Sequence, residues 1–549
     1  MKKPAQTLIL TPPKEADFDG GKPWLIGMWL CPATKLEGLQ SKFNVIPYHW
    51  ENRSKLEADV ESIKVYIGNL KKFLYPALNQ VHQTDYSYSY WNVLLGEWVY
   101  LYTQILFDRW SIVNSVFILN KSNELLRHPF QVNQIPYDTH DFMQSAITDH
   151  NWNANMFINL AHLRSDRHQV NSEKIRIYAK SRDQSSKSFS QKLRLWNLLS
   201  RMYISIFPES KEIIVQSPYL SNLNFIRLCH KLRGLMYFKS EKGFVPSEEY
   251  SRLPRESLSR KLVAINEGDL FSKVLIKNVA DYLPAIYLEH YKAHEKFAKE
   301  KYFNISPRLI VTANSHYTDE TWKSWAASAK ESGAKIVILQ HGGNYGHSKF
   351  SLIQDYEIDL ADIFLSWGWT SPIQEKVRIA PANKLIGIRI NRKKENKNIC
   401  LVVTTESSTY AYWVASMPIG PQVLNGKEMT IRFLKSVKNS MLCSVRVRTY
   451  PVDYGLDQKN SLKSLFPHLS ISSNDCDFRS DLKDARIVVF NHFSTTFIEA
   501  VKMKMPSVVF INRVHWKTDD SFAKLFSSLE EIGVLHYSSE SGMLVLLRF

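Results

Sequence analysis

The amino-acid sequence predicts an α/β protein with two Rossmann-like domains that face a cleft. The α/β rhythm is clearest over residues 308–350, stops in a charged stretch at 389–398 and restarts at 399. A strand–helix–strand unit is typical of a parallel sheet, and a polar stretch between two such regions is typical of a linker. We therefore expect an N-terminal α/β domain over 1–390 and a C-terminal Rossmann-like domain over 396–549.

The stretch 308–350 is the organising unit of the N-terminal domain. Leu309–Val311 is an apolar run that predicts a strand, and apolar residues at three- and four-residue spacings predict a helix over 320–332. Gly333 predicts the end of that helix, and the apolar run 336–339 predicts the next strand. Ligands bind beyond the carboxyl ends of strands in open parallel sheets, so the polar residues after each strand are the first candidates for a site.

The other elements follow from the same patterns. Apolar periodicity predicts long helices, which we expect to be helical insertions in the N-terminal domain, at 54–80, 90–119, 145–163 and 270–301. Pro284 should kink or break the last of them. Short apolar runs predict strands at 7–10, 24–30, 213–216, 399–403, 444–448, 486–490 and, as the final strand, 507–511. Two more helices are expected at 426–440 and 494–504.

The composition indicates a globular protein with an anionic partner. The chain of 549 residues is 44% hydrophobic and 22% charged, and its formal net charge is +17. Such an excess of positive charge favours an anionic partner: a phosphorylated substrate, an anionic lipid surface or nucleic acid. The sequence contains no nucleic-acid recognition module. The basic stretch 174–201 is either a solvated face or a surface for anionic lipid, and we expect it to hold the protein on a membrane.

The cysteines and the apolar runs bear on location. The five cysteines are scattered without metal-ligand or disulfide spacing, which favours a reducing, cytoplasmic compartment. No apolar run approaches the roughly 18 residues of a membrane span, and the start lacks a signal-peptide core. We therefore expect at most peripheral association with the inner face of the cytoplasmic membrane.

The first candidate site follows the strand 336–339. Gln340 and His341 would stand at the strand tip, and Gly342 and Gly343 let a ligand approach the backbone closely. A tight turn that happens to contain a histidine is the alternative. The concentration of polar residues in this short loop favours a site.

The second candidate site follows the strand 486–490. Ser494, Thr495 and Thr496 begin a helix, where free N–H groups and the helix dipole favour an anion such as phosphate. Glu499, in the first turns, could reach a ribose hydroxyl. Ordinary helix capping is the alternative.

Two further clusters contain candidate binding residues. Arg446 and Arg448 alternate with valines, so both side chains point to one face of the strand, near Tyr450. Two arginines on one face suit the binding of a diphosphate. An ordinary edge strand exposed to solvent explains the pattern equally well. Asp475 and Asp477 have a metal-binding spacing, but helix capping and loop structure are commoner uses of such residues, and we expect no metal. The sequence contains no P-loop, dinucleotide-binding, zincin or hydrolase-elbow motif.

In order along the chain, several short motifs resemble a family of putative transferases from bacterial O-antigen and capsule clusters. This family has the GT-B fold and is related to capsule Kdo and nonulosonic-acid transferases of the pseudaminic and legionaminic type. The matching pieces are Trp29-Leu30-Cys31, His49-Trp50-Glu51-Asn52-Arg53, Leu78-Asn79 with His82, Tyr90-Trp91, Asp108-Arg109-Trp110, Gln340-His341-Gly342, Arg448-Thr449-Tyr450-Pro451, and Ser494 to Ala500 followed by Pro506.

This resemblance implies a metal-independent glycosyltransferase without a cofactor. Its donor would be a CMP-activated acidic sugar and its acceptor a lipid-linked or growing surface glycan. The N-terminal domain would be the acceptor side, and the C-terminal domain would bind the nucleotide sugar. Donor-binding residues carried over are Gln340, Gly342, Gly343, Arg448, Tyr450, Ser494, Thr495, Thr496 and Glu499. Where relatives often have a histidine before proline, this chain has Tyr450.

For the chemistry, His341 is the first candidate, because histidine titrates near neutral pH and can bind or protonate the departing phosphate. A carboxylate from the N-terminal domain would then act as base or nucleophile. Glu51 is favoured by its motif, with Asp19 and Asp319 as alternatives, and pairing with Arg53 at a helix start is the structural alternative for Glu51. If neither His341 nor Glu51 acts, Asn314, His316 and Asp319 come next.

Two other functions remain open at this point. Relatives continue into a further helical segment, so we expect the C-terminal domain to be truncated after the apolar end 542–549. A catalytically inactive assembly partner is therefore one alternative. A nucleotide-sugar epimerase of the same fold is the other.

Overall fold

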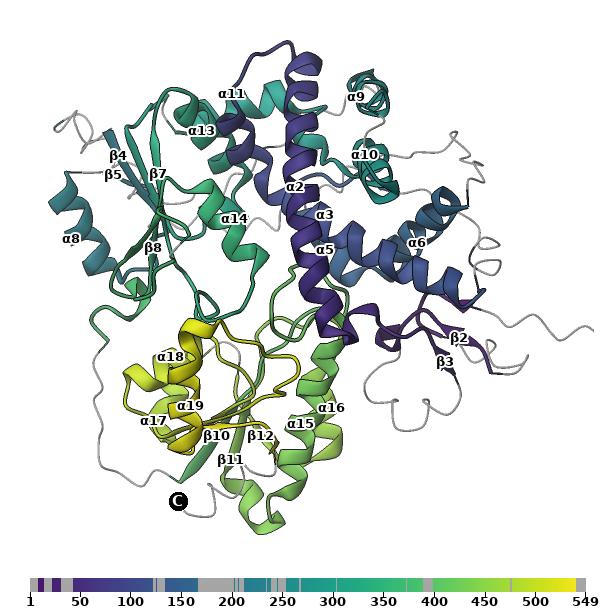
Figure 1. Cartoon of the computed structure of the whole chain (residues 1–549). Helices are drawn as coiled ribbons and strands as arrows, with labels where there is room; N and C mark the ends of the chain where they lie inside the picture. Colours follow the sequence, from purple (N-terminus) through teal and green to yellow (C-terminus); the bar gives the residue numbers. More distant parts are fainter. Residues whose placement is uncertain are drawn as a thin grey trace, which may run out of the picture.

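The computed structural model shows two α/β domains, one above the other (Figure 1). It describes residues 8–13, 22–30, 43–121, 125, 134–165, 202, 206, 212–233, 235–237, 244, 253–265, 268–302, 304–371, 373–388, 398–473 and 476–539. The basic stretch 174–201, Asp19, Asp475, the end 542–549 and nearly all of the linker 389–398 lie outside these residues.

The N-terminal domain contains a six-stranded parallel sheet in the order β5-β4-β6-β7-β8-β9. Its strands are β4 (Ile213–Gln216), β5 (Leu235–Tyr237), β6 (Leu309–Thr312), β7 (Lys335–Leu339), β8 (Ile363–Ser366) and β9 (Val377–Ile379). The organising unit is confirmed: β6 leads through α13 (Glu320–Glu331) to β7, paired in parallel, and Gly333 has a φ of 97° after the helix. The polar loop after β6 also contains one helical turn, α12 (Ser315–Thr318).

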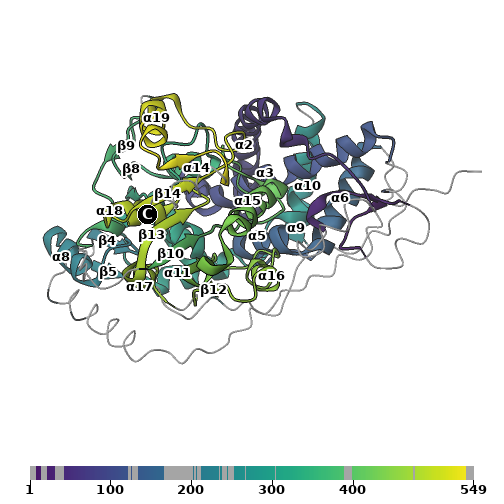
Figure 2. The same ribbon diagram turned by 90° about the horizontal axis from the view of Figure 1, so that it is seen from below.

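Long helices cover one side of this sheet (Figure 1, Figure 2). Two of them, α2 (Arg53–His82) and α3 (Tyr88–Ile118), match the predicted positions, and α3 is buried on almost every side. The other helices on this side are α5 (Thr139–Thr148), α6 (His150–Arg164), α9 (Leu253–Val263), α10 (Leu270–Tyr282), α11 (Tyr291–Lys301) and α14 (Leu352–Leu360). On the opposite face, Phe225 and Cys229 of α8 (Asn222–Leu232) pack with Val215 and Val311 of the sheet. Short 3-10 helices occur at Met28–Leu30, His49–Glu51, Ala285–Tyr287 and Asn383–Leu385.

Two of the predicted elements differ from the structure in detail, and a third is broken where the sequence predicts. The helix expected over 145–163 is two helices, because the Asp149 side chain accepts from Asn151 N and Trp152 N and starts α6. The helix expected over 270–301 is broken at Pro284, as predicted. The strand expected over 24–30 extends only over β2 (Trp24–Leu25), which pairs with β1 (Leu8–Ile9) and β3 (Asn44–Val45) in a small parallel sheet.

The C-terminal domain contains a second six-stranded parallel sheet, in the order β12-β11-β10-β13-β14-β15. Its strands are β10 (Ile399–Val403), β11 (Val445–Arg448), β12 (Ser470–Ile471), β13 (Ala485–Phe490), β14 (Ser507–Phe510) and β15 (Leu535–His536). This is the Rossmann order, which reverses between β10 and β13. The prediction that 507–511 is the final strand is wrong, because β15 pairs beside β14.

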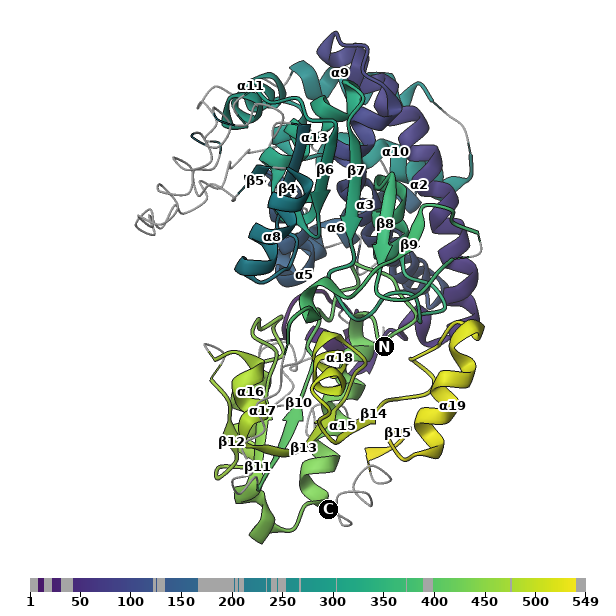
Figure 3. The ribbon, with the colours of Figure 1, turned by 90° about the vertical axis from the view of Figure 1, so that its left-hand side faces the viewer.

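The helices of this domain are α15 (Val423–Ser436), α16 (Gln458–Leu465), α17 (Phe478–Asp484), α18 (Thr495–Lys502) and α19 (Ala523–Glu531), with 3-10 helices at Gly420–Gln422, Asn439–Ser444 and Asp520–Phe522. The arrows of β6 and β7 point toward this domain, and the arrow of β10 points back toward the N-terminal domain (Figure 3). Since ligands bind beyond the carboxyl ends of parallel strands, both ligand-binding edges face the junction. The predicted fold class, two Rossmann-like domains in a GT-B-like arrangement, is confirmed.

A segment of the C-terminal domain, residues 404–422, crosses into the N-terminal domain. Its apolar residues Tyr410, Val414 and Ile419 belong to the same buried core as α3. Arg109 Nη1 donates to the carbonyl of Ala411 at 2.8 Å, and Val414 N donates to Gln104 Oε1 at 2.7 Å. This crossing segment ties the two domains together by core packing and by buried hydrogen bonds.

Candidate functional site

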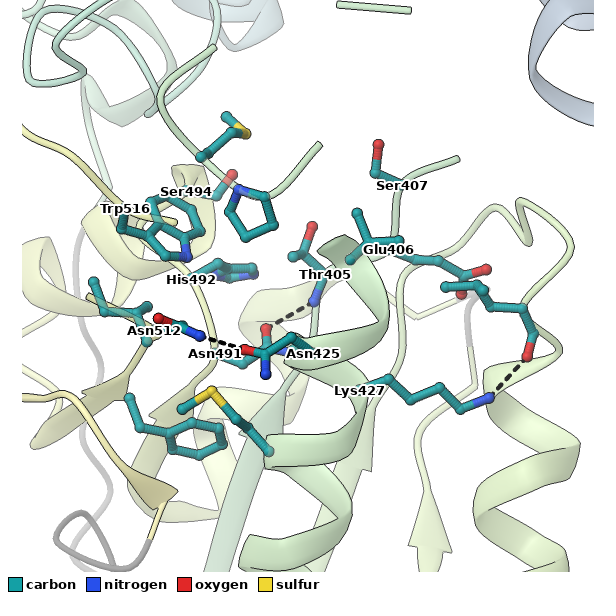
Figure 4. Close-up of a pocket in the computed structure, with 18 of the residues that line it drawn as sticks. Thr405, Glu406, Ser407, Asn425, Lys427, Asn491, His492, Ser494, Asn512 and Trp516 are labelled. Atoms are coloured by element: carbon teal, nitrogen blue, oxygen red, sulfur yellow. Dashed lines mark hydrogen bonds between the residues drawn. The ribbon is translucent and has the colours of Figure 1, made fainter. Parts of the chain in front are cut away.

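A pocket lies in the C-terminal domain where the strand order reverses (Figure 4). Its walls come from the residues that follow β10, β13 and β14 and from the start of α15, and Met417, Pro418 and Asn344 add atoms from the crossing segment and the N-terminal domain. The labelled residues in Figure 4 are Thr405, Glu406, Ser407, Asn425, Lys427, Asn491, His492, Ser494, Asn512 and Trp516. The pocket therefore occupies the position at which doubly wound sheets bind ligands.

Burial shifts the pKa of each of three titratable side chains in the pocket toward the value that favours its neutral form. Burial, with Asp453 nearby, raises the pKa of Glu406 to about 7, although Tyr454 N donates to its Oε1 at 2.9 Å. Burial alone lowers the pKa of His492 to about 4, so this ring is neutral at pH 7. Lys427 Nζ donates to Leu456 O at 2.9 Å and to Ser461 Oγ at 3.0 Å. The pocket thus presents little negative charge to an anionic ligand.

Two polar atoms at the pocket wall have no hydrogen-bond partner among the described residues. They are His492 Nδ1 and Asn344 Oδ1, both buried. An unpaired buried polar atom costs about 1–3 kcal/mol, so such atoms are normally paired by a ligand or by water. Asn512 Nδ2, also at the pocket, donates to Asn425 Oδ1 at 3.0 Å, and the Trp516 ring lies next to His492 (Figure 4). The wall combines amide groups and an aromatic face, as a planar heterocycle requires.

The start of α18 contacts the loop that follows β7. Thr495 Oγ1 accepts a hydrogen bond from Gly343 N at 3.1 Å, and Ser494 lines the pocket. Thr496 Oγ1 is buried without a hydrogen-bond partner in the described structure. Glu499 is buried and is paired with Lys384 Nζ at 3.0 Å and Arg479 Nε at 3.4 Å. Ser494 and Thr495 are thus at the junction, whereas Glu499 lies behind them in an ion-pair network.

Arg448 and Tyr450 lie away from the pocket wall. Arg448 and Arg446 point to one face, as predicted, and both pair with α17: Arg448 Nη1 donates to Asp481 Oδ2 at 2.7 Å. Arg448 Nη2 also donates to Cys476 O at 2.8 Å. The exposed Tyr450 ring lies 6.0 Å from that of Tyr454.

Of the pair Asp475 and Asp477, whose spacing is typical of metal ligands, the structure describes Asp477. Its side chain caps α17 by accepting a hydrogen bond from Arg479 N. Within the described ranges, no group of three or more histidine, cysteine or acidic side chains is arranged to hold a metal ion.

Across the junction, His341 belongs to a buried charged cluster. Its Nδ1 lies 3.2 Å from Glu357 Oε1, and His316 Nε2 lies 3.1 Å from the same oxygen. Glu357, from α14, is fully buried, whereas the His341 side chain is 22% exposed. Burial alone would raise the pKa of Glu357, but the two histidines hold it at about 2. His341 therefore stands at the junction with an ionised carboxylate behind it.

The loop around His341 is shaped by Gln340. Its Nε2 donates to Gly342 O at 2.6 Å, and its Oε1 accepts from Trp367 N and Trp369 Nε1, each at 2.8 Å. All these partners are in the N-terminal domain, so Gln340 acts here as a brace for the loop. The ring of Tyr219 stacks on His341 with centroids 6.1 Å apart, and Asn314 Nδ2 donates to the Tyr219 hydroxyl at 2.9 Å.

The two other predicted carboxylates that the structure describes, Asp319 and Glu51, lie in different surroundings. Asp319 caps α13, accepting from Trp322 N at 3.0 Å, and also accepts from Gln216 Nε2 at 3.2 Å. Glu51 is 3.8 Å from His515 Nε2, next to the pocket residue Trp516. In the described structure no hydrogen bond or ion pair joins either carboxylate to His341. Arg53, which is close to Glu51 in the sequence, donates hydrogen bonds to Gln422 Oε1 and to His515 O, not to Glu51.

Sequence reasoning missed Glu357 and most of the pocket wall. Glu357 is an acid on the buried face of a helix whose other buried residues are apolar, and that position is a signal that the sequence does contain. Glu406 and Lys427 carried no such signal, because each is polar in a polar surrounding sequence.

The comparisons with known proteins concern nearly the whole chain. A model of one protein family, described as LIC12162 family transferase, matches residues 6–542. A comparison with curated proteins gives no match. Among solved structures, that of MurG from Acinetobacter baumannii matches with 9% sequence identity, covers 61% of this chain and 90% of that chain, and has a TM-score of 0.29. Because the family match covers nearly the whole chain, with both domains and the pocket, this chain belongs to the LIC12162 family of transferases.

Proposed function

We propose that this transferase is a glycosyltransferase, which moves an acidic sugar of the Kdo or nonulosonic type from a CMP-activated donor to a bacterial surface glycan. The observation that carries the proposal is the pocket at the strand-order reversal, whose unpaired polar atoms and Trp516 face the junction beside Ser494. A nucleotide fits this chemistry: amide groups suit the edge of a base, the indole suits its face, and the low negative charge suits its phosphate. The net charge of +17 favours the same anionic donor.

The proposed reaction assigns the two sides of the junction different tasks. The bond between the sugar and the phosphate oxygen breaks, and its electron pair leaves with CMP. His341 binds or protonates near the departing phosphate, since an imidazole can carry a proton near neutral pH. A carboxylate of the N-terminal domain, Glu51 or Asp319, removes the proton of the acceptor hydroxyl as the new glycosidic bond forms.

The location proposed for this reaction is the cytoplasmic face of the membrane, with a lipid-linked or growing glycan as acceptor. Among the described residues no helix has the length and apolar content that a membrane crossing requires. Peripheral attachment through the basic stretch 174–201 stays a prediction. It requires binding to anionic vesicles that weakens as salt is added.

A nucleotide-release screen tests the proposal. The purified chain is offered CMP-, UDP- and GDP-sugars with and without a membrane glycan extract. We expect CMP release that requires the acceptor. Conversion of a nucleotide sugar with no acceptor present would identify an epimerase instead, and no turnover with any donor would favour an assembly partner.

Variants then test the residues. His341→Ala and Glu51→Gln should each lower kcat by roughly 10²-fold if the lost contact forms chiefly in the transition state. His468→Ala, at an exposed histidine of the C-terminal domain, is the matched control and should leave kcat unchanged. Wild-type turnover in both variants would move the search to Asn314, His316 and Asp319.

A further inference from the structure

We propose that Glu357 is a positioning residue, which holds His341 with a proton on Nδ1 and so makes Nε2 the nitrogen that takes up a proton and hands it to the departing phosphate. The proposal deepens the proposed function and rests on it for the catalytic consequence. The arrangement itself is a structural statement, and it is testable without any substrate.

The contacts around Glu357 dictate which nitrogens carry protons. An ionised carboxylate only accepts hydrogen bonds, so each nitrogen that bonds to it must be an N–H donor. Glu357 Oε1 lies 3.2 Å from His341 Nδ1 and 3.1 Å from His316 Nε2. Both of these nitrogens are therefore donors, and in a neutral imidazole the remaining nitrogen is then a bare acceptor.

The state of His316 agrees with this assignment. Burial lowers the pKa of His316, so its ring is neutral at pH 7. Its Nδ1 is buried and has no hydrogen-bond partner in the described structure, as expected of the bare nitrogen when Nε2 holds the proton. His316 is fully enclosed and cannot meet a substrate, whereas the His341 side chain is 22% exposed. Of the two histidines, only His341 can exchange a proton across the junction.

Aromatic rings fix the orientation of His341. Tyr219 stacks on it at 6.1 Å, and Tyr317 and Tyr345 meet it edge-on at 5.6 and 5.5 Å. The Tyr345 hydroxyl is 3.4 Å from Nδ1, a longer contact than that of Glu357. With Nδ1 turned inward to α14, Nε2 lies on the opposite edge of the ring. A fixed tautomer and orientation are what a carboxylate behind a histidine supplies in general acid–base sites.

The groups that act on Glu357 come from several elements. The titratable side chains around Glu357 are His316 and Tyr317 of α12, His341 and Tyr345 of the loop after β7, and Tyr356 of α14. The charge of Lys323, from α13, contributes to lowering the pKa of His316. Both histidine rings lie within 3.2 Å of Glu357 Oε1, and of the two only His341 is partly exposed, so loss of the carboxylate should change the protonation of His341.

The test is the ¹⁵N spectrum of the histidine rings, selectively labelled, in the wild type, Glu357→Gln and Asp355→Asn. His341→Ala identifies the signals of His341 by their loss. In spectra recorded at alkaline pH, where an imidazole ring is neutral, we expect the His341 proton on Nδ1 in the wild type and a mixture of tautomers in Glu357→Gln. Asp355→Asn, two residues away on α14 and paired with Lys64 at 3.6 Å, should leave the signals unchanged.

Two further variants keep the test decisive. If Glu357→Gln does not fold, His316→Gln keeps the carboxylate, and His341 should retain its Nδ1 proton. Once a donor is known, Glu357→Gln should lower kcat with little change in KM, and Glu357→Asp should recover part of the loss. A wild-type His341 with its proton on Nε2, or unchanged tautomers in Glu357→Gln, would overturn the proposal. Failure to find any sugar transfer would refute the proposed function and leave the tautomer result standing.

Discussion

The backbone N–H of Gly343 donates a hydrogen bond to Thr495 Oγ1 across the domain junction, at 3.1 Å. The contact joins the loop after β7 to the first residue of α18. A Cβ at Gly343 would lie 2.6 Å from both Ser494 C and Thr495 N, which are backbone atoms that cannot move aside alone. The closeness of the two domains at this point therefore depends on the missing side chain.

We expect Gly343→Ala to destabilise the junction by about 1–3 kcal/mol, the usual cost of overpacking. Thermal unfolding measures the loss, and CMP binding should weaken with it because Ser494 lines the pocket. Gly68→Ala, in the middle of α2 with no atom within 4 Å of the added Cβ, is the control and should raise stability by up to about 1 kcal/mol. Equal melting temperatures for the two variants would contradict the close approach.

Trp516 should contribute to nucleotide binding by stacking. Trp516→Ala should weaken CMP binding by about 1–3 kcal/mol, the range found when a base loses an aromatic partner. Trp516→Phe, which keeps an aromatic ring, should retain part of the affinity. Isothermal titration calorimetry with CMP measures both. Trp367→Phe, on the N-terminal side where Trp367 Nε1 donates to Asn383 Oδ1, serves as the control. The base is not at this wall if Trp516→Ala binds CMP as the wild type does.

Glu97 should make stability fall as the pH rises. Burial raises its pKa to about 8 despite Lys323 Nζ at 2.8 Å. Between the unfolded pKa, near 4.3, and about 8, the folded state holds a proton that the unfolded state has lost, so unfolding is favoured as pH increases. The slope for one proton is at most about 1.4 kcal/mol per pH unit. Urea unfolding of Glu97→Gln at pH 5.5 and 7.5 should show a smaller pH effect than the wild type. Glu61→Gln, at an exposed acid, should keep the wild-type slope.

Arg109 should hold the crossing segment in place. Besides Ala411 O, it donates to Asn153 Oδ1 at 2.9 Å and pairs with the buried Asp108. Arg109→Met leaves that carboxylate without its main cation, which costs about 3–5 kcal/mol in buried pairs. Hydrogen exchange should rise over 408–419, and the melting temperature should drop. Arg432→Met breaks an exposed pair with Glu428 and should cost no more than about 1 kcal/mol. Unchanged exchange in Arg109→Met would show that apolar packing alone holds the segment.

The sequence by itself determined the secondary structure that carries the site. Periodicity located α2, α3 and the unit from β6 to β7, because the apolar stripe of a helix or strand is recorded in consecutive residues. The same logic placed polar residues at strand tips, and His341 and Ser494 do lie at the domain junction. The break at Asp149 was missed, although an aspartate ahead of a helix is a local signal.

Only the tertiary structure decided which of these residues meet. Glu357, His316 and His341 come from three different elements, and nothing local specifies that one carboxylate oxygen serves both rings. The same holds for other contacts of the site. Arg448 pairs with Asp481 of α17. Glu499 pairs with Lys384 and Arg479, and Glu51 lies near His515. The periodicity of one segment predicts which of its faces is buried. It does not predict which other segment covers that face, because an ion pair or a packing contact depends on two segments that are distant in the sequence.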